Sequence, residues 1–141
     1  MPDFEPVRVF LDANVLFSAS YSDRNRFLQF WRMGGVTPVT SPYAIGEVRG
    51  HLRRPGHLER FEELLGRTGV VSDVDLRIIP SGVFVVEKDR PILAAAIGAS
   101  IDYLVTGDKN HFSHLYGATV GFVSVISPAE FLDRFADRVI D

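Results

Sequence analysis

Short apolar runs alternate along the chain with segments of helical periodicity. Residues 7–11 (VRVFL) are typical of a strand that is buried on both faces, and an acid, Asp12, follows directly. The segment 102–108 (DYLVTGD) repeats this arrangement and ends at Asp108. The other segments that the pattern predicts to be extended are 36–41, either 76–80 or 83–87, and 119–125.

Helical patterns fill the intervals between these strands. Ser41 and Ser127 each precede a proline, which is typical of a helix start. Strands that alternate with helices indicate an α/β fold with a mostly parallel sheet, in which ligands bind beyond the carboxyl ends of the strands. The predicted helices are a segment that begins near Asn14, then 24–33, 42–52, 57–66, 90–100 and 128–136.

Composition narrows the classes of function. The chain has 141 residues, of which 46% are hydrophobic and 23% charged, and this suits one domain spanning 1–141. It contains no cysteine, so disulfides, thiolate metal sites and cysteine nucleophiles are excluded. Because the N-terminus does not resemble a signal peptide and no apolar run reaches about 20 residues, we expect a soluble, cytoplasmic protein. A net charge of −3 does not favour a dedicated duplex-binding module.

Four acidic residues lie where such a fold forms its site: Asp12, Glu47, Asp89 and Asp108, hereafter the four acids. Each follows a predicted strand or lies in the first turns of a predicted helix. Taken singly, Asp12 and Asp89 could be helix caps, Asp108 a turn residue, and Glu47 part of a solvated face. Two acids that end two buried strands are harder to explain in this way, because burial penalises an unpaired charge.

If the four acids converge, they repel one another and require a cation at neutral pH. All their donor atoms are oxygens, which favours Mg²⁺ or Mn²⁺. Asn14 and Thr106 are neutral neighbours that could orient the carboxylates. A divalent ion held by carboxylates at the edge of an α/β sheet is typical of phosphoester hydrolysis, because the ion activates water and offsets charge on the leaving oxygen.

The chain resembles the PIN-domain ribonucleases, in particular the VapC-like toxins of bacterial and archaeal toxin–antitoxin pairs. The resemblance covers nearly the whole chain, and the motifs that carry it are FLDANVL, SPYAIGEV and KDRPILAAAIGASIDYLVTGDKNHF. It matches the family's acids to the four acids, and it matches Asn14 and Thr106 to polar positions beside the metal. No acid follows Asp108 in the segment 109–111, so the chain departs from the family's pattern at a second metal site.

This resemblance implies a three-layer α/β/α sandwich with a mostly parallel central sheet. It also implies an endoribonuclease that depends on Mg²⁺ or Mn²⁺, with the four acids as metal ligands and catalytic residues. A small antitoxin protein and a second copy of the chain, in a homodimer, are the implied partners besides RNA. An RNA-processing enzyme and a catalytically silent RNA-binding module of the same fold are the alternatives.

A haloacid-dehalogenase-type phosphatase is the main rival among enzymes, because FLDAN and TGDKN resemble its first and last motifs. That chemistry requires a second acid two residues after the nucleophile, and this chain has Asn14 there. It also requires a further acid shortly after Asp108, and none occurs.

Basic residues cluster between the predicted helices 42–52 and 57–66. They could face RNA phosphates, solvent or an acidic antitoxin segment. The candidates for RNA contacts are Arg49, Arg53 and Arg54, and the cluster also contains His51, His57 and Arg60.

Two further features have competing interpretations. The aromatic stripe of Phe27, Phe30 and Trp31 is either a core face or a surface for a partner. His111 and His114 follow Asp108, but isolated histidines are more often incidental than metal ligands.

Overall fold

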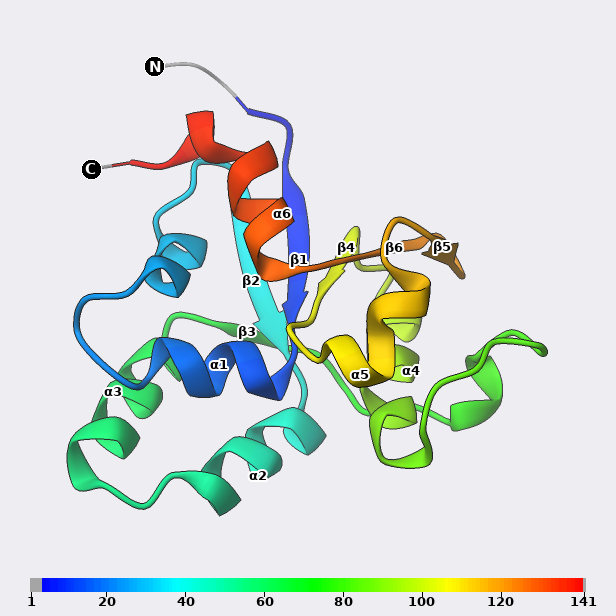
Figure 1. The fold of residues 1–141 in the computed structure, drawn as a ribbon, viewed down its shortest axis with the longest axis horizontal. Coiled ribbons are helices and arrows are strands. Elements are labelled where there is room, and N and C mark those ends of the chain that lie inside the picture. The colour runs from blue at the N-terminus through cyan, green and yellow to red at the C-terminus, as the bar shows by residue number, and fades with distance from the viewer. Residues whose placement is uncertain (1–3, 141) are drawn as a thin grey trace.

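The computed structural model describes residues 4–140 and contains a six-stranded sheet flanked by helices (Figure 1). The predicted domain 1–141 includes residues 1–3 and 141, which lie outside the described part. The strand order is β3-β2-β1-β4-β6-β5, and all pairs are parallel except β5–β6. The strands are β1 (Val7–Leu11), β2 (Val36–Thr40), β3 (Gly69–Val70), β4 (Tyr103–Val105), β5 (Thr119–Val120) and β6 (Val123–Ile126).

Helices cover both faces of this sheet. Helices α1, α3 and α6 pack on one face, whereas α4 and α5 pack on the other, so the predicted three-layer α/β/α architecture is confirmed. The α-helices are α1 (Ala13–Ala19), α2 (Pro42–His51), α3 (Pro55–Leu65), α4 (Arg90–Gly98), α5 (Lys109–Phe112) and α6 (Pro128–Arg134). Short 3₁₀ helices are Arg26–Trp31, Leu76–Ile78, Glu87–Asp89, Ser113–Leu115 and Ala136–Arg138.

Strand β1 lies at the centre of the sheet, between β2 and β4. Val9, Phe10 and Leu11 are fully buried, because successive side chains of a strand point to opposite faces and both faces are covered. Phe10 pairs in register with Val39 of β2 and Leu104 of β4. The apolar run of the sequence is therefore a central strand, as predicted.

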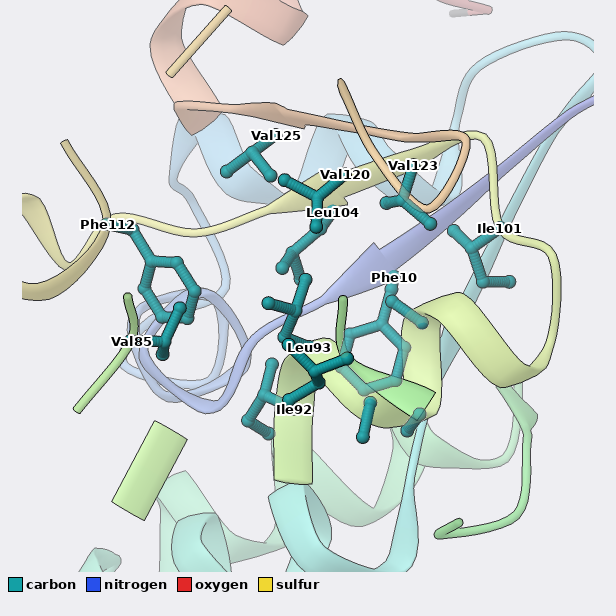
Figure 2. Close-up of a cluster of buried hydrophobic side chains, with 14 of the residues drawn as sticks. Phe10, Val85, Ile92, Leu93, Ile101, Leu104, Phe112, Val120, Val123 and Val125 are labelled. Atoms are coloured by element: carbon teal, nitrogen blue, oxygen red, sulfur yellow. The ribbon is translucent and has the colours of Figure 1, made fainter. Parts of the chain in front are cut away.

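The core on the α4 side is built from large apolar side chains and a run of alanines. Figure 2 shows Phe10 and Leu104, from adjacent strands, beside Ile92 and Leu93 of α4. Each of these side chains contributes about 1.5–3 kcal/mol when it is fully buried. The run Ala94–Ala96 is also fully buried, so its short side chains let α4 lie close to the sheet.

Two helix starts follow the sequence prediction. The Ser41 hydroxyl accepts a hydrogen bond from the backbone N–H of Ala44, and Ser127 does the same for Glu130. Each serine thereby satisfies one of the N–H groups that a helix start leaves unpaired, and the proline that follows needs no N–H partner. Both helices begin at the expected residue.

The prediction of a long helix over 24–33 was wrong. The segment forms the six-residue 3₁₀ helix Arg26–Trp31, and its stripe belongs to the core on the α1 side. Phe30 is fully buried, Phe27 and Trp31 pack against the same cluster, and Trp31 Nε1 donates to Thr68 Oγ1 at 2.9 Å. The stripe is therefore a core face and not an exposed surface for a partner.

Three extended segments also differ from their predictions. Neither 76–80 nor 83–87 forms a strand, and the edge strand beyond β2 is instead the two-residue β3. The segment 119–125 is a hairpin, in which Gly121 and Phe122 have φ values of 53° and 70°. These positive φ values suit a tight turn between antiparallel strands. In the segment 102–108 the strand covers only Tyr103–Val105.

The strand order changes direction between β1 and β4, at the edge of the sheet formed by the carboxyl ends of the strands. The chain passes from β1 to β2 on one side and later enters β4 on the other side, and this switch in strand order is where α/β folds bind ligands. Helices α1, α2 and α5 begin at the same edge (Figure 1). Within residues 4–140, no helix has the length and apolarity that crossing a membrane requires.

Candidate metal centre

A cavity of about 340 Å³ opens at this edge of the sheet. Its walls come from α1, from α2, from the residues that precede α4, and from the residue before α5. All four acids line this cavity, although they come from four different segments of the chain. Asn14, His51 and Lys88 line it too, so both charge signs are present at its surface.

Asp12 directly follows β1 and is only 4% exposed. Its Oδ1 accepts a hydrogen bond from the backbone N–H of Ala13 at 2.7 Å, which makes it the N-cap of α1. Its Oδ2 accepts from Thr106 Oγ1 at 2.8 Å and from Asn14 Nδ2 at 3.2 Å. A carboxylate offers about four lone-pair sites, so Asp12 keeps acceptor capacity beyond these three donors. The cap does not exclude a second role.

Burial dominates the titration of Asp12. It raises the pKa of this carboxyl from 3.8 to about 6, because a buried charge loses its hydration. The hydrogen bonds from Thr106 and Ala13 act in the opposite direction, while the negative charges of Asp89 and Glu47 raise the pKa further. A buried acid with acidic neighbours is stabilised as an anion by a cation at the same place.

Asn14 and Thr106 join the end of β1 to the end of β4. The Thr106 hydroxyl is fully buried, donates to Asp12 and accepts from the backbone N–H of Asp108 at 3.2 Å. Asn14 Oδ1 accepts from the backbone N–H of Gly107 at 2.9 Å. A Cβ at Gly107 would lie 3.3 Å from this oxygen, so glycine permits the close approach. The two neutral residues thus orient the Asp12 carboxylate and fix the backbone of Gly107 and Asp108.

Asp89 is the N-cap residue of α4, the position that the sequence predicts for it. Its side chain makes no cap hydrogen bond, because the 3₁₀ turn Glu87–Asp89 leads directly into the helix. The side chain is 8% exposed, and its Oδ2 is buried with no hydrogen-bond partner among the described residues. A buried carboxylate oxygen without a partner is costly, so Asp89 is a strong candidate to bind a ligand.

Asp108 begins the short helix α5 and faces His111 one turn later. Its Oδ1 accepts from the backbone N–H of His111 at 3.2 Å, so Asp108 is the cap of α5. Its Oδ2 lies 2.7 Å from His111 Nδ1, which also lies 2.6 Å from Asp89 Oδ2. These three side chains can each offer one atom, all within 4.8 Å of one another, to a metal ion.

The sequence favoured an incidental role for His111, whereas the structure places it against two of the four acids. Asp108 and His111 are three residues apart, and this spacing puts two side chains on one face of a helix, so the signal was present. The missing information was the position of Asp89, which comes from another segment and meets the same imidazole. His114, in contrast, is exposed, and its Nε2 contacts the backbone carbonyl of Phe84.

Glu47 completes the acidic lining from helix α2. It is half-buried, and burial is the main cause that raises the pKa of its carboxyl above the usual value. The negative charge of Asp89 raises this pKa further. Nearby Lys88 and His51 act in the opposite direction. No hydrogen bond to the Glu47 carboxylate is found within residues 4–140, so this side chain is free to move toward a ligand.

The family model of the PIN domain matches residues 8–110. The chain belongs to the PIN domain family. The match contains all four acids and ends one residue before His111. No curated protein matches the sequence. Among solved structures, the fold resembles a chain of VapBC2 from Rickettsia felis, determined with a DNA fragment from its promoter, at 13% identity and a TM-score of 0.61 over 86% of this chain and 98% of that chain.

Membership of the PIN domain family agrees with the local structure around Asn14. A haloacid-dehalogenase-type phosphatase needs an acid at this position, whereas Asn14 donates a hydrogen bond to Asp12 and accepts one from Gly107. An amide that makes both contacts supports the neighbouring carboxylate and does not act as a general acid. The rival interpretation as a phosphatase therefore has no support in the site.

The basic residues near this PIN-domain site differ in their availability. Arg49 is paired with Glu62 of α3, through Nε at 3.0 Å and Nη2 at 2.5 Å. Arg53 Nη1 donates to the carbonyl of Gly50 at 2.6 Å. Arg54 is exposed beside the start of α3. Arg49 is thus engaged by a carboxylate, Arg53 by a backbone carbonyl, and Arg54 is exposed.

Proposed function

We propose that this PIN-domain chain, residues 1–141, is an endoribonuclease that depends on Mg²⁺ or Mn²⁺. Asp12, Glu47, Asp89 and Asp108 are its catalytic carboxylates and its metal ligands, and Asn14 with Thr106 orients the Asp12 carboxylate and joins it to the backbone before α5. The observation that carries the proposal is the convergence of the four acids on one cavity, where burial and mutual repulsion raise the pKa of Asp12 to about 6. Such a cluster is stabilised by a cation at neutral pH.

The residues present fit a divalent cation. Asp89 Oδ2 is buried and has no hydrogen-bond partner among the described residues. A carboxylate oxygen of Asp108 lies within 4.8 Å of the donor atoms of Asp89 and His111, close enough to share one ion. Asp12 retains a free acceptor site, and Glu47 is not hydrogen-bonded within residues 4–140. Carboxylate oxygens of this kind are the donors that Mg²⁺ and Mn²⁺ prefer.

The chain's own residues then divide the reaction between them. Asp12, Asp89 and Asp108 hold fixed positions, because strand ends and helix starts determine their backbones. The Glu47 carboxylate makes no hydrogen bond within residues 4–140, so it is free to orient the attacking water and take its proton. A divalent cation, when bound, offsets the charge on the phosphate and leaving oxygens and makes the water easier to deprotonate.

RNA contacts fall to the basic residues at the rim. Lys88 and His51 line the cavity, and the exposed Arg53 and Arg54 follow α2 directly. Cationic side chains at these positions can hold the phosphates on either side of the scissile bond. Arg49 contributes less to binding than Arg53 and Arg54, since it is paired with Glu62.

We also propose a role as the toxin of a toxin–antitoxin pair, which is supported by membership of the PIN domain family and by the fold shared with a chain of VapBC2. In this proposal a small antitoxin protein binds the nuclease and blocks it. A homodimer is the other proposed assembly. Both partners are inferences from the family, and the first is open to a direct test in cells.

The purified protein should cleave RNA in the presence of Mn²⁺ or Mg²⁺ and should not cleave it in EDTA. The reason is that the four acids repel RNA phosphates unless a cation neutralises them. The assay follows single-stranded and structured RNAs on gels. Cleavage that persists in EDTA contradicts the mechanism, and binding without cleavage in any ion identifies a silent RNA-binding module instead.

A matched pair of variants controls this assay. Glu47→Gln removes the proposed proton acceptor, whereas Glu59→Gln removes an exposed acid on α3 that does not line the cavity. We expect the first variant to lose cleavage and the second to retain it. Equal activity of the two variants would show that Glu47 has no part in the reaction.

Expression of the wild-type protein in cells should arrest growth if it acts as a toxin. Glu47→Gln should be harmless at the same expression level, because the arrest depends on cleavage. A small acidic protein encoded beside this chain should relieve the arrest when the two are expressed together. Harmless expression of a nuclease that is active in vitro would instead indicate an RNA-processing role.

A further inference from the structure

Asp89, Asp108 and His111 form a group of side chains that could hold a metal ion, and His111 supplies its one nitrogen donor. We propose that His111 is a direct ligand of the bound ion through Nδ1, together with Asp89 and Asp108, and that this nitrogen gives the site a preference for a divalent transition-metal ion such as Mn²⁺ over Mg²⁺. The inference rests on the metal site of the proposed function, but it does not depend on RNA as the substrate.

The positions of the three donor atoms carry the inference. His111 Nδ1 lies 2.6 Å from Asp89 Oδ2 and 2.7 Å from Asp108 Oδ2. Neither contact has hydrogen-bond geometry, so His111 Nδ1 and Asp89 Oδ2 are both buried polar atoms without a hydrogen-bond partner among the described residues. Neighbouring ligands of an octahedral ion lie about 3 Å apart when the bonds are about 2.1 Å long. A small outward movement of these atoms therefore makes room for an ion.

The fold holds the imidazole in this position. His111 lies in α5, whose first turn is fixed by the hydrogen bond from its own N–H to Asp108. The next residue, Phe112, is fully buried and lies beside Val85 in the core of the α4 side (Figure 2). Asp89 is fixed separately at the start of α4. Two separate segments thus present one nitrogen and two oxygens to the same point.

A nitrogen donor changes the metal preference of an acidic site. Mg²⁺ prefers an all-oxygen environment, whereas imidazole is a common ligand of first-row transition metals. A set of two carboxylates and one imidazole therefore gains more from Mn²⁺ than from Mg²⁺. The competing account is that a charged His111 serves as the counter-ion of the two carboxylates and leaves no room for a metal at this point.

Pulsed electron paramagnetic resonance of the Mn²⁺-loaded, full-length protein separates the two accounts. Electron spin echo envelope modulation detects a ¹⁴N nucleus bonded to Mn²⁺. We expect a ¹⁴N coupling in the wild type, its loss in His111→Ala, and its retention in His114→Ala, which removes a nearby histidine that contacts a carbonyl and no carboxylate.

Calorimetric titration of the same proteins with Mn²⁺ and with Mg²⁺ gives an independent readout. His111→Ala should lower the Mn²⁺ affinity by about 10- to 100-fold or more. Loss of a residue that only hydrogen-bonds to a metal ligand already costs about this much. His111→Asp replaces the nitrogen with oxygens, so the ratio of Mn²⁺ to Mg²⁺ affinity should fall. His114→Ala should leave both affinities unchanged.

Two results would overturn the inference. The first is that the wild type binds Mn²⁺ without a ¹⁴N coupling. This result can be interpreted from the wild-type protein alone. The coupling could also persist in His111→Ala and vanish in His51→Ala, which would assign the nitrogen to the histidine on α2 that lines the cavity. Neither result bears on RNA cleavage, which the EDTA assay decides separately, so failure of the ligand assignment and failure of the proposed function are distinguishable.

Discussion

Asp89→Asn should reduce metal-dependent RNA cleavage by on the order of 100-fold or more, since even a group that only supports a metal ligand is worth about 10- to 100-fold. The substitution neutralises a carboxylate whose Oδ2 is buried in the cavity and free of hydrogen bonds among the described residues. The amide is almost the same size, so the lost property is charge. Cleavage rates at saturating Mn²⁺, measured for both proteins, give the ratio.

The same variant separates a site role from a structural role. Asp89 makes no cap hydrogen bond, so Asp89→Asn should unfold in EDTA at or above the wild-type temperature. Asp137→Asn, at an exposed position away from the cavity, is the matched control and should cleave like the wild type. A variant that melts well below the wild type and keeps its activity would show that Asp89 is a structural residue.

In EDTA, the free energy of unfolding should fall by roughly 3 kcal/mol through Asp12 as the pH rises from about 3 to about 7. The folded pKa of Asp12 is raised by burial, so over this range the unfolded chain releases its proton first and the folded chain binds more protons. Stability therefore decreases with rising pH and levels off above the folded pKa. Urea unfolding at a series of pH values measures the effect.

Asp12→Asn isolates this contribution from those of other acids. Asparagine caps a helix about as well as aspartate, but it does not titrate. The difference in unfolding free energy between the two proteins should change by the stated amount across this pH range and stay constant above it. A constant difference at every pH would mean that burial does not raise the pKa of Asp12.

Patterns that involve one segment were predictable from the sequence. The run 7–11 is apolar at successive positions because β1 is covered on both faces, and Ser41 with Pro42 marks a helix start by local hydrogen bonding. The errors fell where distant contacts decide the structure. The segment 24–33 forms only the 3₁₀ helix Arg26–Trp31, whose Phe30 packs into the core on the α1 side, and 119–125 folds back on itself at Gly121.

The candidate site was predictable where it depends on patterns within single segments, but not where it depends on contacts between segments. The carboxyl ends of parallel strands and the starts of the helices that follow them lie at one edge of a sheet, so the four acids could be grouped without a structure. The absence of a cap hydrogen bond at Asp89 could not be predicted, because the residue before a helix normally makes one. His111 becomes a candidate metal ligand through its contact with Asp89, and this contact could not be predicted because Asp89 lies in a different segment of the chain.

The most direct test of the metal centre is a crystal of the protein soaked in Mn²⁺, with diffraction data collected for the anomalous signal of manganese. The account predicts an anomalous peak within about 2.5 Å of the carboxylate oxygens of Asp89 and Asp108, on the side of the cavity that Asp12 and Glu47 line. An empty cavity at a Mn²⁺ concentration that supports cleavage, or a peak held by other residues, would contradict it.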